Sequence, residues 1–451
     1  MEMKKYKLSE ICRIASSKRI FESEYVERGV PFIRGQEISD GSILDPKASF
    51  ECYISQSRYE EIKEKHGKPN KGDILITAVG TIGNLCYLDK DIDFYFKDGN
   101  VIWFSEIISS CDGKFLFHFM KSSYFKEQLK YFMIGAVQKA LTIDMLKKVE
   151  VPLPPLPTQQ KIAAVLSSLD DKIALNKKIN AKLEAMAKRL YDYWFVQFDY
   201  PDKNGKPYKT SGGKMVWNEV LKREIPEGWE VKRLGEVCDF RNGINYEKNN
   251  SGDKIYKIVN VRNITATTFF LNQNDFDEIC LQSKIADNYL IPEISILIAR
   301  SGSPGATRVI MNVKNNVIFC GFIICMEKFT PKYKFYFTYF LKKLENTNAT
   351  KTGGSILQNV SQDTLKRLSV IIPPKEMIDE FNEKILPIFN YQLTIQKEIQ
   401  KLTKLRDRLL PLLMNGQVEV GTNNSSEFCN AKLGKQATAC DMNGQVEVVE
   451  K

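Results

Sequence analysis

The sequence predicts an α+β fold in which one structural unit is used twice. Three observations predict it: segments of the first half recur in order in the second half, short β-type runs dominate the front of each copy, and a helical apolar repeat fills its back. We expect two similar domains separated by a pair of long antiparallel coiled-coil-like helices and related by a pseudo-twofold axis. A length of 451 residues is enough for two or three domains with cores of their own.

Four recurring segments indicate the internal repeat. Residues 8–12 match 234–238, 30–38 match 256–264, 73–83 match 295–305, and 146–155 match 365–374. The offset between the copies falls from 226 to 219 residues along the chain. Short deletions in the surface loops of a common fold produce this pattern. One such match arises by chance, whereas four in the same order indicate a duplication.

The front part of each copy, 1–157 and 229–375, is predicted to be a mixed domain. Its strand-like runs are separated by Gly, Asn and Asp, and examples are 74–77, 100–104, 296–298 and 317–319. Helical patterns also occur there, at 114–131 and 333–344. Strands and helices mixed in this way are typical of an α+β domain.

The back part of each copy, about 158–195 and 376–413, has apolar residues in alternating steps of four and three, which is the seam of a coiled-coil-like helix. The seam residues are Ile162, Leu166, Leu169, Ile173, Leu183, Ala187 and Leu190 in the first helix and Phe381, Ile385, Ile388, Ile395, Ile399, Leu402 and Leu409 in the second. Asn176, Asn180 and Gln392 place polar side chains in these seams. Because neither helix can bury a one-sided seam alone, we expect the two to pack together.

Prolines and glycines mark the expected ends of these elements. Pro387 lacks the amide that would bind the carbonyl of Glu383, which predicts a kink, and Pro411 predicts the end of the second helix. Segment 196–228 contains three prolines and four glycines and is predicted to be the linker between the copies. Beyond the repeat, 414–420 (Met-Asn-Gly-Gln-Val-Glu-Val) recurs at 442–448, and we expect 414–451 to form a poorly ordered, dispensable tail.

Ten cysteines and two histidines argue against a metal centre. The nearest cysteine pair, Cys320 and Cys325, lacks further ligands at zinc-finger spacing. His66 lies in a polar stretch and His118 in an apolar run, so we expect a solvated histidine and a core histidine. The N-terminus lacks the apolar region of a signal peptide, and no apolar run approaches the ~18 residues of a membrane span. We therefore expect a cytoplasmic protein with free thiols.

The sequence lacks the motifs of nucleotide-driven or methyl-transfer chemistry. Neither Gly-x-Gly-x-x-Gly nor a Walker lysine loop occurs. One pattern, Asp202 followed by Glu230 and Lys232, has the Pro-Asp, acid-x-Lys order of metal-dependent nucleases, but its first acid lies in the predicted linker rather than on a strand. A standalone nuclease therefore stays as one alternative, and a protein-interaction scaffold without a DNA role is another.

Two similar domains on a rigid spacer suit an object that is read at two separated points, and DNA is such an object. Polar side chains able to read base edges occur in loop-like stretches of both copies. The candidates are Lys18, Arg19, Arg34, Gln36, Thr81, Gln138 and Lys139 in the first copy and Arg241, Asn242, Asn260, Arg262, Asn263, Arg300, Ser301, Ser303, Lys351 and Gln358 in the second. The glycine turns 79–83 and 301–305 are either bare turns or backbone approaches to a phosphate.

Four segments resemble the specificity subunits of type I restriction-modification systems. Residues 151–162 (Val-Pro-Leu-Pro-Pro-Leu-Pro-Thr-Gln-Gln-Lys-Ile) open the first helix, 188–199 end it, 225–234 precede the second domain, and 405–416 close the second helix. The resemblance covers about 1–420 in the family's own order. It is strongest in the segments that flank the helices and weak inside the two domains.

The resemblance implies that 1–157 and 229–375 are target recognition domains, each reading one half of a bipartite DNA site, with the helices setting the unread spacer. It implies no catalytic residue, metal or cofactor on this chain. Two methyltransferase (modification) subunits would carry S-adenosylmethionine, and restriction endonuclease/translocase subunits would cleave DNA with ATP and Mg. Family analogy puts the modification-subunit contacts on the helices.

We expect the partner contact at an exposed aromatic helix end formed by Tyr191, Trp194 and Phe195, with Leu410 and Leu413 as counterparts. Packing against the adjacent domain is the competing explanation. The net charge of +10 is uneven, because 1–157 has 23 basic and 22 acidic residues whereas 229–374 has 19 and 13. A near-neutral first domain implies that the isolated chain binds DNA weakly and that partner subunits supply much of the phosphate neutralisation.

Overall fold

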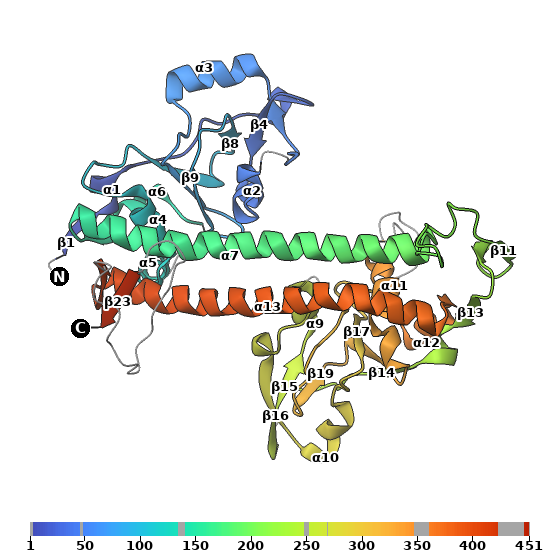
Figure 1. The fold of residues 1–451 in the computed structure, drawn as a ribbon. Helices are drawn as coiled ribbons and strands as arrows, with labels where there is room; N and C mark the ends of the chain where they lie inside the picture. The colour runs from blue at the N-terminus through green and yellow to red at the C-terminus, as the bar shows by residue number, and fades with distance from the viewer. Residues whose placement is uncertain are drawn as a thin grey trace. The chain divides into compact units, whose positions relative to one another are not determined.

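The computed structural model describes residues 3–45, 48–133, 140–247, 252–267, 269–346, 360–422 and 446–450. The chain divides into unit 1, made of Met1–Leu175 and Ile399–Lys451, and unit 2, made of Asn176–Glu398. Each unit contains one mixed domain and a part of both long helices (Figure 1). Four candidate DNA-binding residues, Gln138, Lys139, Lys351 and Gln358, lie outside the described residues.

The domain of unit 1 is built on two four-stranded sheets. The first has the order β2 (Arg13–Ala15), β9 (Val101–Ser105), β6 (Ile74–Thr77), β7 (Leu85–Tyr87), with all neighbours antiparallel. The second has the order β3 (Tyr25–Val26), β5 (Tyr53–Ile54), β4 (Val30–Ile33), β8 (Tyr95–Phe96), and β4 runs parallel to β8. Strand β1 (Lys4–Lys7) pairs with β10 (Glu150–Leu153). The helices are α1 (Leu8–Ile11), α2 (Gly35–Ser39), α3 (Gln56–His66), α4 (Gly113–Lys121), α5 (Ser123–Phe132) and α6 (Ile143–Lys147).

The domain of unit 2 repeats this arrangement. Its four-stranded sheet has the order β14 (Asp239–Asn242), β20 (Ile323–Glu327), β17 (Ile296–Ala299), β18 (Thr307–Arg308). A three-stranded sheet has the order β16 (Asp277–Leu281), β15 (Lys254–Val259), β19 (Val317–Phe319), and β13 (Glu230–Arg233) pairs with β21 (Ser369–Ile372). The helices are α8 (Leu234–Val237), α9 (Val261–Thr265), α10 (Ser283–Ala286), α11 (Lys334–Asn346) and α12 (Gln362–Arg367).

The strand registers confirm the internal repeat. Ile74 of β6 pairs with Phe104 of β9, and Ile296 of β17 pairs with Met326 of β20, so both partners are shifted by 222 residues. The parallel pair β4–β8 likewise corresponds to β15–β19. The predicted α+β class is confirmed, and the structure also corrects a detail. The pattern at 114–131 forms two helices rather than one, because Ser122 ends α4 and its hydroxyl accepts the amide of Phe125 at 3.2 Å, which caps α5.

The two long helices are α7 (Leu156–Tyr191), followed by a π-helical turn at Asp192–Val196, and α13 (Lys375–Met414). Helix α13 continues through Pro387 and ends three residues beyond Pro411. A proline inside a helix removes one hydrogen bond and costs about 3 kcal/mol. Burial of the neighbouring Ile385 and Ile388 offsets this loss, so the helix does not break.

The helices pack antiparallel within each unit (Figure 1). In unit 1, Asp170 of α7 lies 2.9 Å from the guanidinium of Arg406 of α13. In unit 2, the amide of Gln392 donates to the carbonyl of Asn180 at 3.3 Å. Also in unit 2, the rings of Trp194, just beyond the end of α7, and Phe381, near the start of α13, lie 5.8 Å apart. Within this unit the α13 partner number therefore falls as the α7 number rises, which is the mark of an antiparallel pair. The seam residues Ile162, Leu166, Leu169, Ile173, Phe381, Ile385, Ile388, Ile395 and Leu409 are buried, as predicted.

A polar layer interrupts this apolar seam in unit 2. The side chains of Asn176 and Gln392 are buried, and Asn180 lies beside them. One polar atom of each of these three side chains has no hydrogen-bond partner among the described residues. An unmet buried polar atom costs about 1–3 kcal/mol, so the layer lowers stability. Such a layer favours the one helix register in which the polar groups face one another.

The segment predicted as a linker, 196–228, is folded rather than loose. Its strands β11 (Met215–Asn218) and β12 (Arg223–Pro226) form an antiparallel hairpin. Tyr200 stacks on Trp229 with ring centroids 5.3 Å apart, and Phe198 is buried against the same tryptophan. The aromatic side chains between the glycines and prolines therefore anchor this segment to the core of unit 2.

Part of the predicted tail is also paired. Strand β22 (Val418–Thr422) runs antiparallel to β23 (Val446–Glu450), and Val420 lies opposite Val448, which is the same position of the duplicated heptapeptide. The expectation of a poorly ordered tail is therefore wrong for these two strands. Residues 423–445 lie outside the described part of the chain.

Cysteines, histidines and helices of the described residues were each the subject of an expectation. The eight cysteines in these segments are free thiols. His66 is exposed, and His118 is buried. No helix in these segments is both long enough and apolar enough to cross a bilayer.

A small charged network joins the domain of unit 1 to both helices. Lys121 of α4 lies 2.9 Å from Asp170, which also pairs with Arg406, and the buried His118 contacts Ser167 of α7 at 3.1 Å. Burial lowers the pKa of His118 to about 4, with Lys121 adding to the shift, so this histidine is neutral at pH 7. Burial opposes ionisation of Asp170, but Lys121 and Arg406 outweigh it and hold the pKa of this carboxyl below its ordinary value.

Replacing Asp170 with Asn is expected to lower the free energy of unfolding at pH 7 by about 2 kcal/mol, because two cations lose their carboxylate partner. A lowered folded-state pKa gives stability that is present above the ordinary value of 3.8 and is lost as pH falls through the lowered pKa. The difference between wild type and Asp170→Asn should therefore shrink in acid. Urea unfolding between pH 7 and pH 3 measures it, with the exposed neighbour Asp171→Asn as control. An equal loss in both variants would contradict the role of this network.

Candidate nucleic-acid interface

The candidate polar residues gather at one end of the four-stranded sheet in each unit. Because the strands are antiparallel, β2 and β6 end where β9 and β7 begin, and β14 and β17 end where β20 and β18 begin. We call the loops at this end the first loop cluster (16–19, 34–36, 78–84 and 97–100) and the second loop cluster (242–246, 260–263, 300–306 and 319–322). Sequence reasoning selected residues far apart in the chain, and the sheet brings them to one edge.

In the first loop cluster, short contacts hold the loops around exposed polar side chains. The backbone amide of Lys18 donates to the hydroxyl of Tyr95 at 2.8 Å, and the guanidinium of Arg19 pairs with Asp98 at 2.9 Å. Burial raises the pKa of Tyr95, so this hydroxyl stays protonated. The side chains of Lys18, Arg19, Gln36 and Thr81 are exposed.

Helix α2 closes the other side of the first loop cluster. Ser39 of α2 and Thr81 share a hydroxyl–hydroxyl hydrogen bond of 2.9 Å. Arg34 precedes the helix, and its guanidinium contacts Glu51 at 3.6 Å and the Cys52 sulfur at 2.9 Å. Arg34 is therefore half-buried and partly neutralised, whereas Gln36 keeps its amide in solvent.

The second loop cluster divides its polar residues between two roles. Arg241 pairs with Glu327 at 2.9 Å and also donates to the carbonyls of Asn288 and Leu290. Asn263 is buried, and its amide accepts from the backbone of Asn260 at 2.8 Å. Asn263 therefore helps to build the loop, and the half-buried guanidinium of Arg241 is held by Glu327 and two carbonyls. Base contact by either residue stays a prediction.

The remaining candidates of the second loop cluster are more open. Arg262 is exposed and pairs with Asp277, and Asn242 is exposed. Arg300 is half-buried, and its guanidinium donates to the carbonyl of Gly321 at 3.3 Å. Among the described residues, Arg300 has no carboxylate within ion-pair distance. Ser301 and Ser303 follow it in the glycine turn and are half-buried.

The two glycine turns have the same backbone geometry. Gly83 donates its amide to Thr77, and Gly305 donates to Ala299, each at 2.9 Å. Gly80 and Gly83, like their equivalents Gly302 and Gly305, have positive φ between 70° and 90°. Only glycine adopts this conformation without steric cost. The conformation itself accounts for these glycines, and phosphate binding by their amides stays a prediction.

Sequence reasoning missed one position of the loop clusters, the turn before the central strand. Gly99–Asn100 precedes β9, and Gly321–Phe322 precedes β20 at the same offset of 222 residues. Ala78 donates its amide to the carbonyl of Asn100 at 2.8 Å, and Arg300 donates to that of Phe322 at 2.9 Å. The only sequence signal for this turn is a glycine that recurs at the same offset. Gly99 lies between 73–83 and 146–155, outside the four segments that indicate the repeat.

Residues of the nuclease-like pattern do not form a metal site. The carboxylate of Asp202 accepts the backbone amides of Asn204 and Lys206 at 2.8 Å, within a turn. Glu230 pairs with Lys232 at 2.7 Å, beside it on β13. Across the described segments, no group of three potential metal ligands converges.

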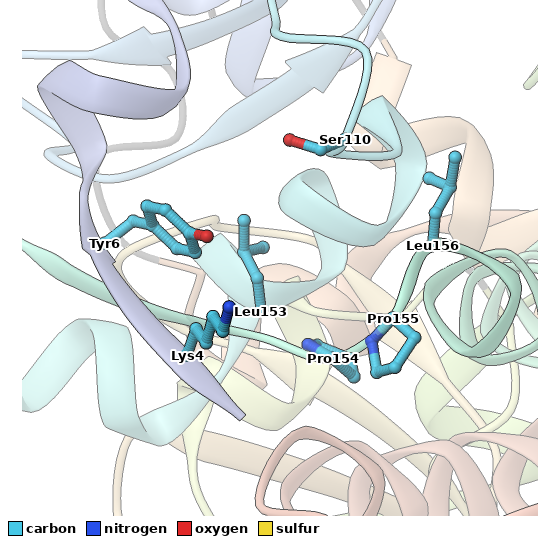
Figure 2. A pocket seen from close by; sticks show the side chains of 7 residues that line it. All are labelled: Lys4, Tyr6, Ser110, Leu153, Pro154, Pro155 and Leu156. Atoms are coloured by element: carbon cyan, nitrogen blue, oxygen red, sulfur yellow. The ribbon is translucent and has the colours of Figure 1, made fainter. Parts of the chain in front are cut away.

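A hollow of about 370 Å³ lies beside the start of α7 in unit 1 (Figure 2). Figure 2 shows Lys4 and Tyr6 on strand β1, Leu153 at the end of β10, and Pro154, Pro155 and Leu156 on the chain that enters α7. Ser110 completes the lining. Among the described residues that line it, the titratable groups are the Lys4 ammonium and the Tyr6 phenol.

The prediction of an exposed partner surface at the end of α7 is wrong, because its aromatic side chains are buried. Tyr191 stacks on Tyr339 with centroids 5.4 Å apart, and Phe195 lies 4.9 Å from Phe381 and 4.8 Å from Tyr336. Trp194 is buried in the same core, and in unit 1 Leu413 is buried and Leu410 packs against the core. The competing explanation, packing against the adjacent domain, accounts for all five residues.

A groove on the helix pair of unit 2 lies next to these buried rings. It has a volume of about 650 Å³ and is lined by Met186, Arg189, Leu190, Asp192, Tyr193, Gln197, Lys384 and Ile388. Both α7 and α13 contribute to it. Met186 is 52% exposed and Tyr193 37%, so apolar atoms remain open to solvent between charged side chains.

Comparison with known proteins agrees with this architecture. The family model described as type I restriction modification DNA specificity domain matches residues 1–185 and 226–405. The specificity subunit of the type I restriction enzyme MjaIX from Methanocaldococcus jannaschii is 29% identical over 406 residues, which cover 88% of each chain. That of HindI from Haemophilus influenzae is 26% identical over 84% of this chain and 94% of its own. The crystal structure of the type I restriction-modification S subunit from M. genitalium shares the fold, with a TM-score of 0.53 and 14% identity over 91% of this chain and 96% of its own.

Burial of the aromatic helix end makes a stability prediction. Phe195→Ala is expected to lower the free energy of unfolding by about 3–5 kcal/mol, because it leaves a cavity between Tyr336 and Phe381. Tyr193→Ala, two residues away and partly exposed, should change it by less than about 1 kcal/mol. Urea unfolding of the purified chain measures both. Similar small losses in the two variants would mean that Phe195 is not a core residue.

Proposed function

This chain belongs to the type I restriction-modification DNA specificity family, and from that premise we propose that its two domains each read one half of a bipartite DNA site. The chain is the DNA specificity subunit of a type I restriction-modification system, and catalysis resides in partner modification and restriction subunits. The observation that carries the proposal is the repeated loop cluster. Equivalent sheets in the two units present polar loops at the same end.

The side chains in the loop clusters have the chemistry needed to read base edges. In the first cluster, Gln36 offers an amide to adenine, and Lys18 and Arg19 offer cations to guanine or phosphate. In the second, Arg300 is a guanidinium without a carboxylate partner among the described residues, and such a group suits bidentate contact with guanine. The two clusters carry different residues at equivalent positions, which supports two half-sites of different sequence.

The long helices are proposed to set the unread spacer between the half-sites. Helix α7 has 36 residues and α13 has 40, which correspond to about 54 Å and 60 Å at 1.5 Å per residue. A turn of B-DNA is about 34–36 Å. The buried seam and the polar layer of Asn176, Asn180 and Gln392 support a fixed helix register, which a spacer of defined length requires.

Partner subunits are proposed to supply what this chain lacks. Two modification subunits with S-adenosylmethionine would methylate adenine, and restriction subunits with ATP and Mg would cleave the DNA. The near-neutral first domain supports weak DNA binding by the isolated chain, because each neutralised phosphate adds affinity through counterion release. Modification subunits bound beside it would provide the missing cations.

We place one modification-subunit contact at the groove of unit 2 rather than at the buried aromatic residues. The groove exposes Met186 and Tyr193 between Arg189, Asp192 and Lys384. An apolar centre with a charged rim is typical of protein interfaces. An apolar helix face of a modification subunit is the occupant that this lining fits.

Exchanging residues 1–157 for the first domain of another family member should change one half of the methylated site. The second half should be retained, because the second loop cluster is untouched, and so should the spacer, because most of both helices is retained. Mapping methylated bases in cells that carry the chain with its partner subunits measures all three. Loss of both halves together, or a changed spacer, would contradict the model in which each domain reads one half-site and the helices set the spacer.

Met186→Glu should weaken assembly with the modification subunits at least tenfold, because it places a charge in the apolar centre of the groove. Size-exclusion chromatography of the mixed subunits measures assembly, and urea unfolding checks the fold. Leu175→Glu is the matched control, since Leu175 is also 52% exposed on α7 but lies outside the groove. Normal assembly of Met186→Glu, or equal losses in both variants, would rule out this groove as a specific contact.

A further inference from the structure

Phe322 is an exposed aromatic residue within the second loop cluster, and its side chain is 62% exposed. It lies in a tight turn between β19 and β20, where the amide of Ile323 donates to the carbonyl of Cys320 at 3.0 Å. Exposing a large ring in this way forgoes the stabilisation of about 1.5–3 kcal/mol that its burial would bring. A single exposed apolar side chain is common on a protein surface. Phe322 differs by its place within the second loop cluster, where its carbonyl accepts the amide of the half-buried Arg300.

The backbone around Phe322 is held on both sides. Its carbonyl accepts the amide of Arg300 at 2.9 Å, and the amide of Gly321 donates to the carbonyl of Ile244 at 2.7 Å. A Cβ on Gly321 would stand 1.9 Å from the side-chain oxygen of Asn245, so a larger residue there would have to displace that side chain. Phe322 is therefore presented from a rigid position, as a residue that reads a base must be.

The equivalent residue of unit 1 is Asn100. It follows Gly99 as Phe322 follows Gly321, and its carbonyl accepts the amide of Ala78, the counterpart of Arg300. One backbone position thus carries an amide side chain in one domain and an aromatic ring in the other. Asparagine is suited to adenine, whereas an apolar side chain is suited to the 5-methyl group of thymine.

We propose that Phe322 reads a thymine in the half-site of the second domain by contact with its 5-methyl group. This inference rests on the proposed function, and it adds a residue that determines specificity. In the major groove, the thymine methyl group is the apolar feature that base edges offer. The neighbouring Arg300 supplies a hydrogen-bonding group for an adjacent base pair, so ring and guanidinium together distinguish a two-base step.

The test uses the full chain assembled with its modification subunits and a duplex that carries the mapped target site. Each thymine of the second half-site is replaced in turn by deoxyuridine, which lacks only the methyl group. For wild type, one replacement should weaken binding about fourfold, the effect of one buried methyl group. For Phe322→Asn that sensitivity should disappear, so that thymine and deoxyuridine are bound equally at this position. Asparagine already occupies the equivalent turn of unit 1, so this variant is expected to fold.

The controls separate this inference from the proposed function. Ile285→Ala removes another exposed apolar side chain, on α10 outside the loop cluster, and should keep the wild-type sensitivity. Deoxyuridine in the first half-site should affect wild type and Phe322→Asn alike. A wild-type assembly with no deoxyuridine-sensitive position in the second half-site, or a Phe322→Asn variant that keeps the sensitivity, would overturn the role of Phe322 alone. A wild-type assembly without sequence-dependent DNA binding would overturn the proposed function and this inference with it.

Discussion

Neither long helix can exist in water with its apolar seam uncovered, and this constraint organises the rest of the chain. Ile162, Leu166 and Leu169 of α7 are covered within unit 1, where Leu409 of α13 is buried in the same core. In unit 2, Phe381 and Ile385 of α13 lie in one core with Ala187 and Tyr191 of α7. Because each unit contains part of both helices, neither mixed domain has a core made of its own residues alone. Each core is completed by residues from distant parts of the sequence.

The polar layer on this helix pair lowers stability but favours one helix register. An apolar seam alone permits several registers, since one leucine replaces another with little change in free energy. The polar layer restricts that freedom, because a shift by one turn would separate the Gln392 amide from the Asn180 carbonyl, to which it donates at 3.3 Å. The proposed spacing of two half-sites by the helices requires such a defined register, even where it reduces the free energy of unfolding.

The loop clusters show how one scaffold presents two different sets of side chains. The strand registers, the glycine turns and the carbonyl contacts before the central strand are the same in both units. The side chains on this frame differ, as Asn100 and Phe322 illustrate. Some polar residues, such as Arg241 and Asn263, are spent on building the loops, so their neighbours are free to face solvent. Polarity in a loop is therefore a poor guide to function until the partners of each group are known.

Local periodicity and segments that recur in order are enough to predict the repeat, the α+β class, the seams of the two helices and the family. The sequence also located the loops that the sheets bring to one edge. Which residues of these loops are exposed follows from the folded chain, because burial and hydrogen bonding depend on partners far away in the sequence. The aromatic end of α7 resembles an exposed surface in the sequence, yet Tyr336, Tyr339 and Phe381 cover it. Pro387 predicts a kink from the sequence, and the structure shows that α13 continues through it, with Ile385 and Ile388 buried on either side of it in the chain. Phe322 has no sequence pattern of its own, and its exposure follows from the turn that holds it.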